Sequence, residues 1–217
     1  MALPTFLELV NDVLTRMREP EVSTVNENVL SKLVGKFIND AKRNVEGSFN
    51  WRALRSVVPV TTSNGVYNYT LSNTSVQSNL EYAWDNTSKQ YLSIVDPVSM
   101  NEWLSKDTLD VGSPHYLNFS GYSNGELQVN LYPVPDGVYN LQFTMFNPQP
   151  ALVNDTDTMK APSEPVIFLA YSKAAVERGE DGGLSSSEAY TLFRQSLADH
   201  ISYENGRHPY GEVWETE

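Results

Sequence analysis

The sequence predicts an α+β protein. Its N- and C-terminal helices form a four-helix platform, a small antiparallel β-sandwich or barrel is inserted between them, and an extended C-terminal tail follows. Helical hydrophobic periodicity occupies the two ends of the 217-residue chain, alternating periodicity occupies the middle, and turn-forming residues separate them. Two amphipathic helices at one end cannot bury their apolar faces alone. We therefore expect the four terminal helices to pack together around one core.

The first two helices are predicted at about residues 5–18 and 26–48. Thr5 and Glu8 fit a capping box, in which each side chain accepts from a backbone N–H at the helix start, and Pro20 ends the first helix. Apolar residues recur at three- and four-residue steps in both helices, for example Phe6 to Met17 in the first. The basic residues of the second helix are expected largely away from its apolar stripe: Lys32, Lys36, Lys42 and Arg43.

The middle of the chain predicts short strands. Val58 and Val60 precede a turn at Asn64 and Gly65, and alternating apolar residues follow it, which is typical of a β-hairpin. Further strands are expected near residues 79–85, 90–95, 115–119, 126–132 and 138–146, with a short helix at about 97–105. Strands at this spacing favour a small sandwich or barrel.

Helical periodicity resumes after a Pro- and Asp-rich loop at 147–164. The third terminal helix is predicted from residue 163 or 164 to Gly179 or the following glycines, and the fourth from a capping box of Ser185 and Glu188 to about Tyr203. The predicted domains are a helical domain of residues 1–52 and 148–204, an inserted β-domain of residues 53–147 and a C-terminal extension of residues 205–217.

The composition excludes several classes of function. The chain has 27 acidic and 15 basic residues and a formal net charge of −12, so it should repel a phosphate backbone rather than bind it. It has no cysteine, which excludes disulfides, Cys-ligated zinc and thiol catalysis. No apolar run is long enough for a membrane span, and the N-terminus does not fit a signal peptide. We expect no cofactor and no membrane partner.

Catalytic patterns are weak. The three histidines His115, His200 and His208 are far apart and have no metal-ligand spacing. No nucleotide-binding or nucleophile motif occurs. The group Asn154, Asp155 and Asp157 does not fit an EF-hand, and a solvated acidic loop is the better interpretation.

Two alternatives to a structural role stay open. Glu81, Asp85 and Glu102 are candidate carboxylates for a cell-wall hydrolase, by their location alone. A glycan-binding module would stack sugars on aromatic side chains, for which the candidates are Trp51, Trp84 and Trp103. Core and subunit-contact roles are the more common ones for such residues.

Four segments in a fixed order are more specific together than any one alone. They are PTFLELVNDVLTRMRE, LVGKFINDAKRNVEGSFNWRALRSVVPVTT, SNGVYNYTL and PVIFLAYSKAAVERGED, and they include 72 of the 217 residues. In this order they resemble the head-to-tail adaptor (connector) proteins of short-tailed and related tailed bacteriophages.

The resemblance implies a non-enzymatic structural protein of the virion, located at the head–tail interface and made in the host cytoplasm. Such adaptors form rings, usually of twelve copies, beneath the portal protein. Tail nozzle and tail fibre proteins dock below, and genomic DNA passes through the channel without specific binding. Their C-terminal extensions reach along the portal, which implies portal-binding roles for Pro209, Tyr210, Val213 and Trp214.

A closed ring uses a heterologous contact between two different faces of neighbouring subunits. Residues 177–217 carry nine acidic and three basic residues. We therefore expect the basic outer side of the second helix to meet the acidic C-terminal helices of the next copy. The residues predicted at this subunit interface are Lys36, Lys42, Arg43 and Trp51.

Overall fold

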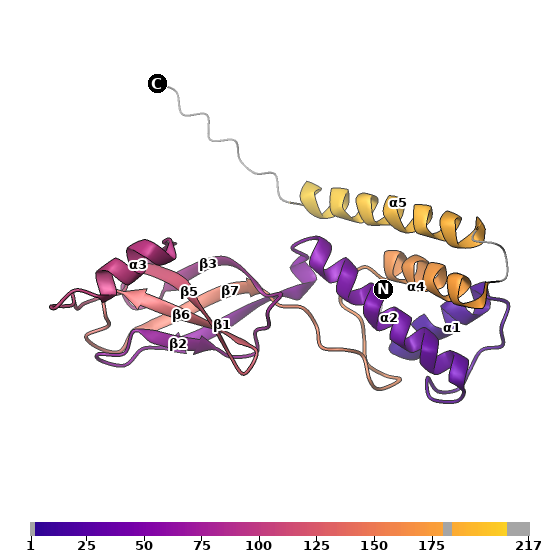
Figure 1. Cartoon of the computed structure of the whole chain (residues 1–217), viewed down its shortest axis with the longest axis horizontal. Coiled ribbons are helices and arrows are strands. Elements are labelled where there is room, and N and C mark those ends of the chain that lie inside the picture. The colour runs from indigo at the N-terminus through magenta and orange to yellow at the C-terminus, as the bar shows by residue number, and fades with distance from the viewer. Residues whose placement is uncertain (1–2, 180–183, 208–217) are drawn as a thin grey trace, which may run out of the picture. The chain divides into compact units, whose positions relative to one another are not determined.

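A computed structural model of the chain describes residues 3–179 and 184–207 (Figure 1). The described residues form two compact units. The helical unit comprises Met1–Ala53 and Gln149–Glu217, and the β-unit comprises Leu54–Pro148. The described part of the chain contains five α-helices and a seven-stranded sheet, which confirms the predicted α+β class.

The helical unit begins with α1 (Phe6–Arg16) and α2 (Val29–Ser48). The capping box of α1 is present: Glu8 Oε2 accepts from Thr5 N at 2.7 Å, and the Thr5 hydroxyl accepts from Glu8 N at 3.3 Å. The α2 helix starts three residues later than predicted because Asn28 and Ser31 cap it. The apolar stripes of both helices are buried, with Leu30, Leu33 and Phe37 of α2 only partly so.

The two C-terminal helices are α4 (Ser163–Arg178) and α5 (Leu184–Gly206). Gly179 ends α4 with a φ of 63°, a left-handed conformation that suits glycine. The α4 helix packs against α1, α2 and α5, and Figure 1 shows it between α2 and α5. The fifth helix begins before the predicted cap at Ser185 and continues past the predicted end at Tyr203.

The β-unit contains seven strands and α3 (Pro97–Leu104), and a 3-10 turn (Arg52–Leu54) precedes its first strand. The strands are β1 (Arg55–Thr61), β2 (Asn68–Leu71), β3 (Asn79–Asp85), β4 (Gln90–Ile94), β5 (Tyr116–Ser123), β6 (Glu126–Tyr132) and β7 (Asn140–Phe146). Their order in the sheet is β1-β7-β3-β4-β5-β6-β2. The end strands β1 and β2 contact each other, so the sheet is a nearly closed, barrel-like structure.

Two details of the predicted sheet are wrong. The predicted hairpin across Asn64 and Gly65 does not form, because β1 pairs with β7 and β2 pairs with β6. The chain does turn at Gly65, whose φ is 77° and whose N–H donates to Pro135 O at 2.8 Å. The sheet is also not fully antiparallel: β4 and β5 pair in parallel, as the crossover through α3 allows.

Alternating residues of all seven strands point into one core. The buried cluster consists of Val58, Val60, Leu71, Ala83, Leu92, Leu117, Leu127, Val129, Leu131, Leu141, Phe143 and Met145. This alternation leaves the residues between them on the outer face of the barrel-like sheet, where partners can reach them.

Candidate interaction surfaces

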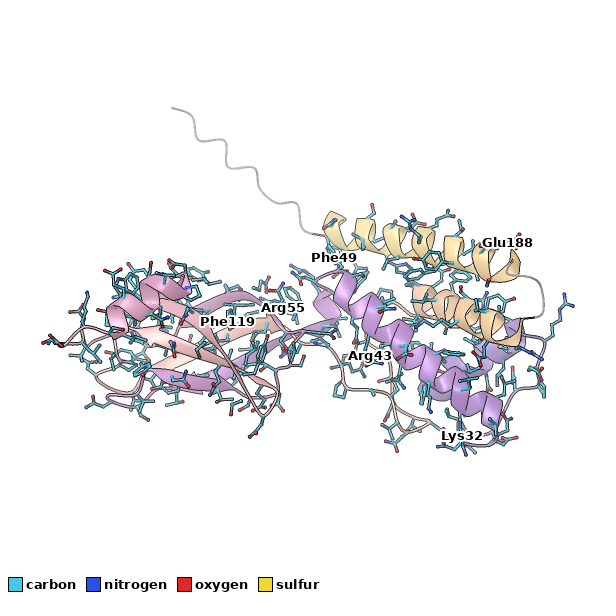
Figure 2. All side chains as sticks on the ribbon, viewed as in Figure 1. Lys32, Arg43, Phe49, Arg55, Phe119 and Glu188 are labelled. Carbon is cyan, nitrogen blue, oxygen red and sulfur yellow. The ribbon has the colours of Figure 1, made fainter. Side chains whose placement is uncertain are left out.

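One side of α2 is exposed and has two chemically different flanks. Successive residues of a helix are about 100° apart, so Lys32, Lys36 and Arg43 follow one flank of the exposed side. Half-buried apolar residues follow the other flank. We call Leu30, Lys32, Leu33, Lys36, Phe37 and Arg43 the α2 strip. Asp40, which pairs with Arg43, lies between its two flanks. Figure 2 shows Lys32 and Arg43 at separate points along it.

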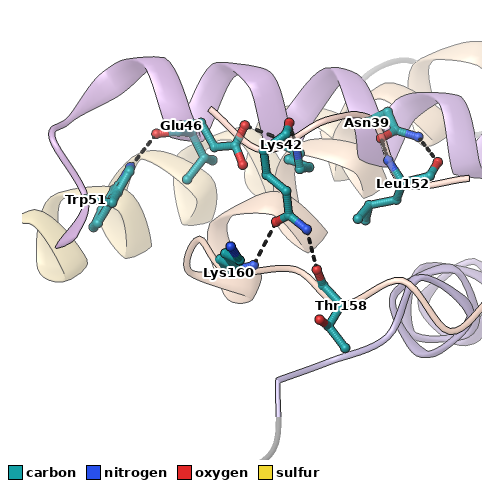
Figure 3. Close-up of polar contacts among 9 residues, drawn as sticks. Asn39, Lys42, Glu46, Trp51, Leu152, Thr158 and Lys160 are labelled. Atoms are coloured by element: carbon teal, nitrogen blue, oxygen red, sulfur yellow. Dashed lines mark hydrogen bonds and ion pairs between the residues drawn. The ribbon is translucent and has the colours of Figure 1, made fainter. Parts of the chain in front are cut away.

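Lys42 does not lie on this exposed side, and the prediction that it does is wrong. Its side chain is 1% exposed and forms an ion pair with Glu46 at 3.1 Å (Figure 3). Its ammonium also donates to the carbonyl oxygen of Gln149. Lys42 falls one turn after Ile38 and so lies within the buried stripe of α2.

Burial shifts both groups of this pair toward their neutral forms. Desolvation lowers the pKa of Lys42, and the nearby Glu46 carboxylate only partly opposes the shift. Desolvation likewise raises the pKa of Glu46, against the effect of Lys42. The second oxygen of Glu46 has no hydrogen-bond partner among the described residues. The pair is therefore an internal feature of the helical unit.

Trp51 is also buried within the helical unit. Its side chain is 2% exposed, and its indole Nε1 donates to Val45 O at 2.7 Å (Figure 3). Phe49 packs against it edge to face, with the ring centroids 5.4 Å apart. Of the four residues predicted at a subunit interface, Lys36 and Arg43 are thus exposed in this structure, whereas Lys42 and Trp51 are buried. Arg43 is paired with Asp40.

The loop of residues 149–162 fastens the helices together. Asn39 of α2 exchanges two hydrogen bonds with the backbone of Leu152, at 2.8 and 3.0 Å (Figure 3). The carbonyl oxygen of Asp157 accepts from Phe6 N at 2.8 Å, and that of Asp155 accepts from Leu7 N at 3.1 Å. These bonds satisfy two of the N–H groups that the first turn of α1 leaves free.

The carboxylates of this loop also accept hydrogen bonds from backbone N–H groups. Asp155 Oδ1 accepts from Val25 N at 2.9 Å. Asp157 Oδ2 accepts from Val153 N at 2.7 Å and from Asn154 N at 2.8 Å, and these bonds lower the pKa of Asp157. No group of three metal-binding side chains occurs within residues 3–179 and 184–207. The loop was predicted as a solvated acidic loop, and its carboxylates in addition accept hydrogen bonds from backbone N–H groups.

The outer face of the β-unit carries an exposed aromatic cluster. Tyr91 of β4 lies edge to face with Trp84 and Tyr82 of β3, with centroid distances of 4.7 and 5.8 Å. Tyr91 is 66% exposed and Tyr82 is 39% exposed. Arg55 donates to Tyr82 Oη at 3.1 Å and pairs with Glu81 at 2.5 Å. We call Tyr82, Trp84 and Tyr91 the aromatic cluster.

Sequence reasoning found only one member of this cluster. Trp84 is the member that was predicted. Trp103, the other candidate tryptophan of the β-unit, packs on Tyr116 and Tyr132 instead, at centroid distances of 5.1 and 5.0 Å. The signal that identifies Tyr82 is its position two residues before Trp84, on the opposite side of β3 from the core residue Ala83. Tyr91 is found only through the strand register, in which it lies opposite Trp84.

Two of the three candidate acids are bound by neighbouring residues, and the third is exposed. Asp85 is fully buried and accepts from Thr87 N at 2.7 Å, with Ser113 Oγ at 3.4 Å. Glu81 is held by Arg55, and Glu102 is exposed on α3. The histidines are not brought together either: His115 is exposed next to Tyr116 in the β-unit, and His200 lies on α5, whereas His208 is outside the described residues.

The predicted portal-binding residues Pro209, Tyr210, Val213 and Trp214 lie outside the described residues. The last described turn of α5 is hydrogen-bonded to the segment that follows α2. Glu204 is 8% exposed, and its Oε1 accepts from Arg52 N at 3.0 Å. The chain therefore leaves α5 close to the segment that follows α2.

The helical unit thus has exposed helix faces, and the β-unit has an exposed aromatic cluster. Comparison with models of protein families shows the family of the chain. The model of the SU10 adaptor protein family matches residues 4–211, nearly the whole chain, so the chain belongs to this family. The match confirms the resemblance to bacteriophage head-to-tail adaptors.

A search of curated proteins found no match to this chain. Within the described residues, no helix is both long enough and apolar enough to cross a membrane. Membership of an adaptor family agrees with a structural, non-enzymatic role in the virion.

Proposed function

We propose that this chain is the ring-forming head-to-tail adaptor of a tailed bacteriophage, located between the portal protein and the tail. The observation that carries the proposal is the match of the adaptor family over residues 4–211. In this proposal the four terminal helices form the platform of each ring subunit. The platform comprises residues 1–52 and 148–204, the inserted β-domain comprises residues 53–147, and residues 205–217 extend from the platform.

The ring contact that we propose joins α2 of one copy to α5 of the next. The α4 helix packs against both helices in the same copy, and each keeps an exposed side. The α5 helix leaves three large side chains about half exposed or more: Tyr190, Leu192 and Tyr203. Aromatic side chains such as these two tyrosines are enriched at interfaces between proteins. Two different faces meeting in this way can close a ring, here of twelve copies.

Charge supports the same contact. Lys36 and Arg43 of the α2 strip are exposed, and Glu188 and Asp199 are exposed on α5. Oppositely charged groups at the edge of an interface accelerate association and fix its register. Lys42 and Trp51 are not proposed as contacts between copies, since both are buried within the helical unit.

The extension of residues 205–217 would bind the portal protein through Pro209, Tyr210, Val213 and Trp214, and the tail nozzle and fibre proteins would dock on the ring. Its channel would pass DNA because the chain is acidic: the net charge is −12, and residues 53–150 carry eight acidic and three basic residues. Acidic surfaces offer no contacts that release counterions from DNA. The protein would be made in the host cytoplasm and assembled into the virion.

The test is to mix the purified chain with a portal ring and to measure the mass of the product by native mass spectrometry. We expect about one copy per portal subunit, and loss of binding when the chain ends at residue 207. The double variant Lys36→Glu/Arg43→Glu should lower the number of bound copies, whereas the control Lys106→Glu, at an exposed lysine of the β-unit, should not. No association of the unaltered chain with any portal ring would refute the proposal.

A second function is favoured by the aromatic cluster. A platform of exposed rings is the arrangement that stacks on sugar faces, so the β-unit of an adaptor subunit would bind host-surface polysaccharide. Tyr91→Ala and Trp84→Ala should then each abolish retention on host polysaccharide. The control is Tyr122→Ala, at an exposed tyrosine of β5 outside the cluster. Equal retention of all three variants would reject this function.

A further inference from the structure

The basic flank of the α2 strip is exposed, and its Arg43 pairs only with Asp40 of the same helix among the described residues. Lys32 and Lys36 form no ion pair with any residue in the described ranges, and Leu33 and Phe37 are only half covered. A surface with a basic flank beside an apolar flank fits an extended segment that carries acidic and aromatic side chains together.

The chain itself contains such a segment. Residues 208–217 read HPYGEVWETE, with three glutamates, no lysine or arginine, and the large apolar side chains Tyr210, Val213 and Trp214. The acidic groups complement the basic flank of the α2 strip, and the aromatic groups complement Leu33 and Phe37.

The segment starts where it can reach the strip. Glu204, near the end of α5, accepts from Arg52 N at 3.0 Å, and Arg52 follows the last residue of α2 by four positions. From Ser48 back to Lys32, α2 is about 24 Å long at about 1.5 Å per residue. Ten extended residues span about 33 Å. The segment is therefore long enough to run the length of the strip, antiparallel to α2.

We infer that in the free chain residues 208–217 fold back along the α2 strip of the same copy and cover it. This inference deepens the proposed function and rests on it in one respect: the covered strip is the surface proposed for the ring contact. A copy whose segment is on its own strip cannot accept α5 of a neighbour. The chain would thus remain monomeric until a partner engages the segment and uncovers the strip.

Disulfide trapping in the free chain tests this inference, because the sequence has no cysteine of its own. In the double variant Lys36→Cys/Glu215→Cys, we expect a disulfide within one copy to form at least tenfold faster than in the control Thr191→Cys/Glu215→Cys. The control cysteine lies on the exposed side of α5. Replacing Tyr210 and Trp214 by alanine in the first variant should reduce the rate to that of the control.

Equal rates for the two cysteine pairs would overturn the inference. Disulfides that join two copies, at a rate that rises with concentration, would also overturn it, because the segment would then cover a neighbour's strip. Carbodiimide coupling of Lys32 or Lys36 to the glutamates of residues 212–217 in the unaltered chain gives a second readout that needs no substitution.

The two proposals fail separately. If the disulfide forms rapidly in a chain that never binds a portal ring, the inference that residues 208–217 cover the α2 strip is supported and the adaptor function is rejected. Portal binding without preferential trapping keeps the adaptor function and rejects the fold-back. If both hold, the disulfide-trapped chain should form no ring on the portal until the disulfide is reduced.

Discussion

Removing one partner of the buried pair of Lys42 and Glu46 should destabilise the helical unit severely. Both side chains are at most 1% exposed, and the ammonium also donates to Gln149 O. Breaking a buried ion pair leaves an uncompensated charge, which costs about 3–5 kcal/mol. We expect Lys42→Met and Glu46→Gln each to lower the free energy of unfolding of the helical unit by about that amount.

Replacing both partners should cost far less. The double variant Lys42→Met/Glu46→Leu removes both charges and fills the space with apolar atoms. Such replacements of buried pairs range from neutral to about 1–4 kcal/mol more stable. We therefore expect the double variant to be at least as stable as the unaltered chain, although the two single effects would add to about 6–10 kcal/mol of destabilisation.

The assay must report on each unit separately, since the chain divides into two compact units. Amide hydrogen exchange of peptides from α2, measured against denaturant, gives the free energy for the helical unit, and peptides from β6 are the internal control. Single variants that stay within about 1 kcal/mol of the unaltered chain at α2 would refute the reasoning, because the pair would then not be desolvated as described.

The same pair predicts two pH dependences of stability. Burial raises the pKa of Glu46 above its ordinary value of 4.5, so the folded state binds more protons there, and stability falls as pH rises from 4.5 through the raised pKa. Burial lowers the pKa of Lys42 below 10.5, so stability rises with pH between the lowered pKa and 10.5. Both slopes should be absent in the double variant.

Two further predictions concern the stability of the helical unit, one at Gly35 of α2 and one at Asp157 of the loop. Gly35→Ala should destabilise it by about 1–3 kcal/mol through overpacking, because the added Cβ would lie 3.0 Å from both Phe6 and Val25. The control Gly47→Ala, with open space in the same helix, should stabilise by about 0.5–1 kcal/mol in denaturant unfolding. Asp157→Ala should lower the melting temperature at neutral pH. Since the folded pKa of Asp157 is below 3.8, this difference should disappear as pH falls from 3.8 through the lowered pKa, and a constant difference would contradict the role of the carboxylate.

Local structure was largely predictable from the sequence. The helices and strands follow from hydrophobic periodicity, and the Thr5 and Glu8 capping box was predicted because its two residues are only three positions apart. Strand partners were not predictable in the same way. The sequence around Gly65 fits a hairpin, but β1 pairs with residues 79 to 91 positions away and β2 with residues 56 to 62 positions away, and such pairings leave no local signal.

The surfaces were predicted in part, for a related reason. A lysine at any helix position indicates exposure unless a buried partner is known, and the partner of Lys42 includes the carbonyl of Gln149, from a distant loop. Trp51 has the same ambiguity between core and contact, which the bond to Val45 O resolves in favour of the core. Lys36 and Arg43 are on the expected side because no residue of their own unit buries them.

The loop of residues 149–162 determines when the protein can finish folding as it is synthesised. The free N–H groups of Phe6 and Leu7, the amide of Asn39 and the ammonium of Lys42 all find their acceptors beyond residue 148. The β-unit, in contrast, is one continuous stretch from Leu54 to Pro148. When the ribosome has released the first 148 residues, all strands of the β-unit are therefore present, whereas these groups of α1 and α2 still lack their acceptors. The helices α1 and α2 are thus synthesised before the β-unit but complete their hydrogen bonds after it.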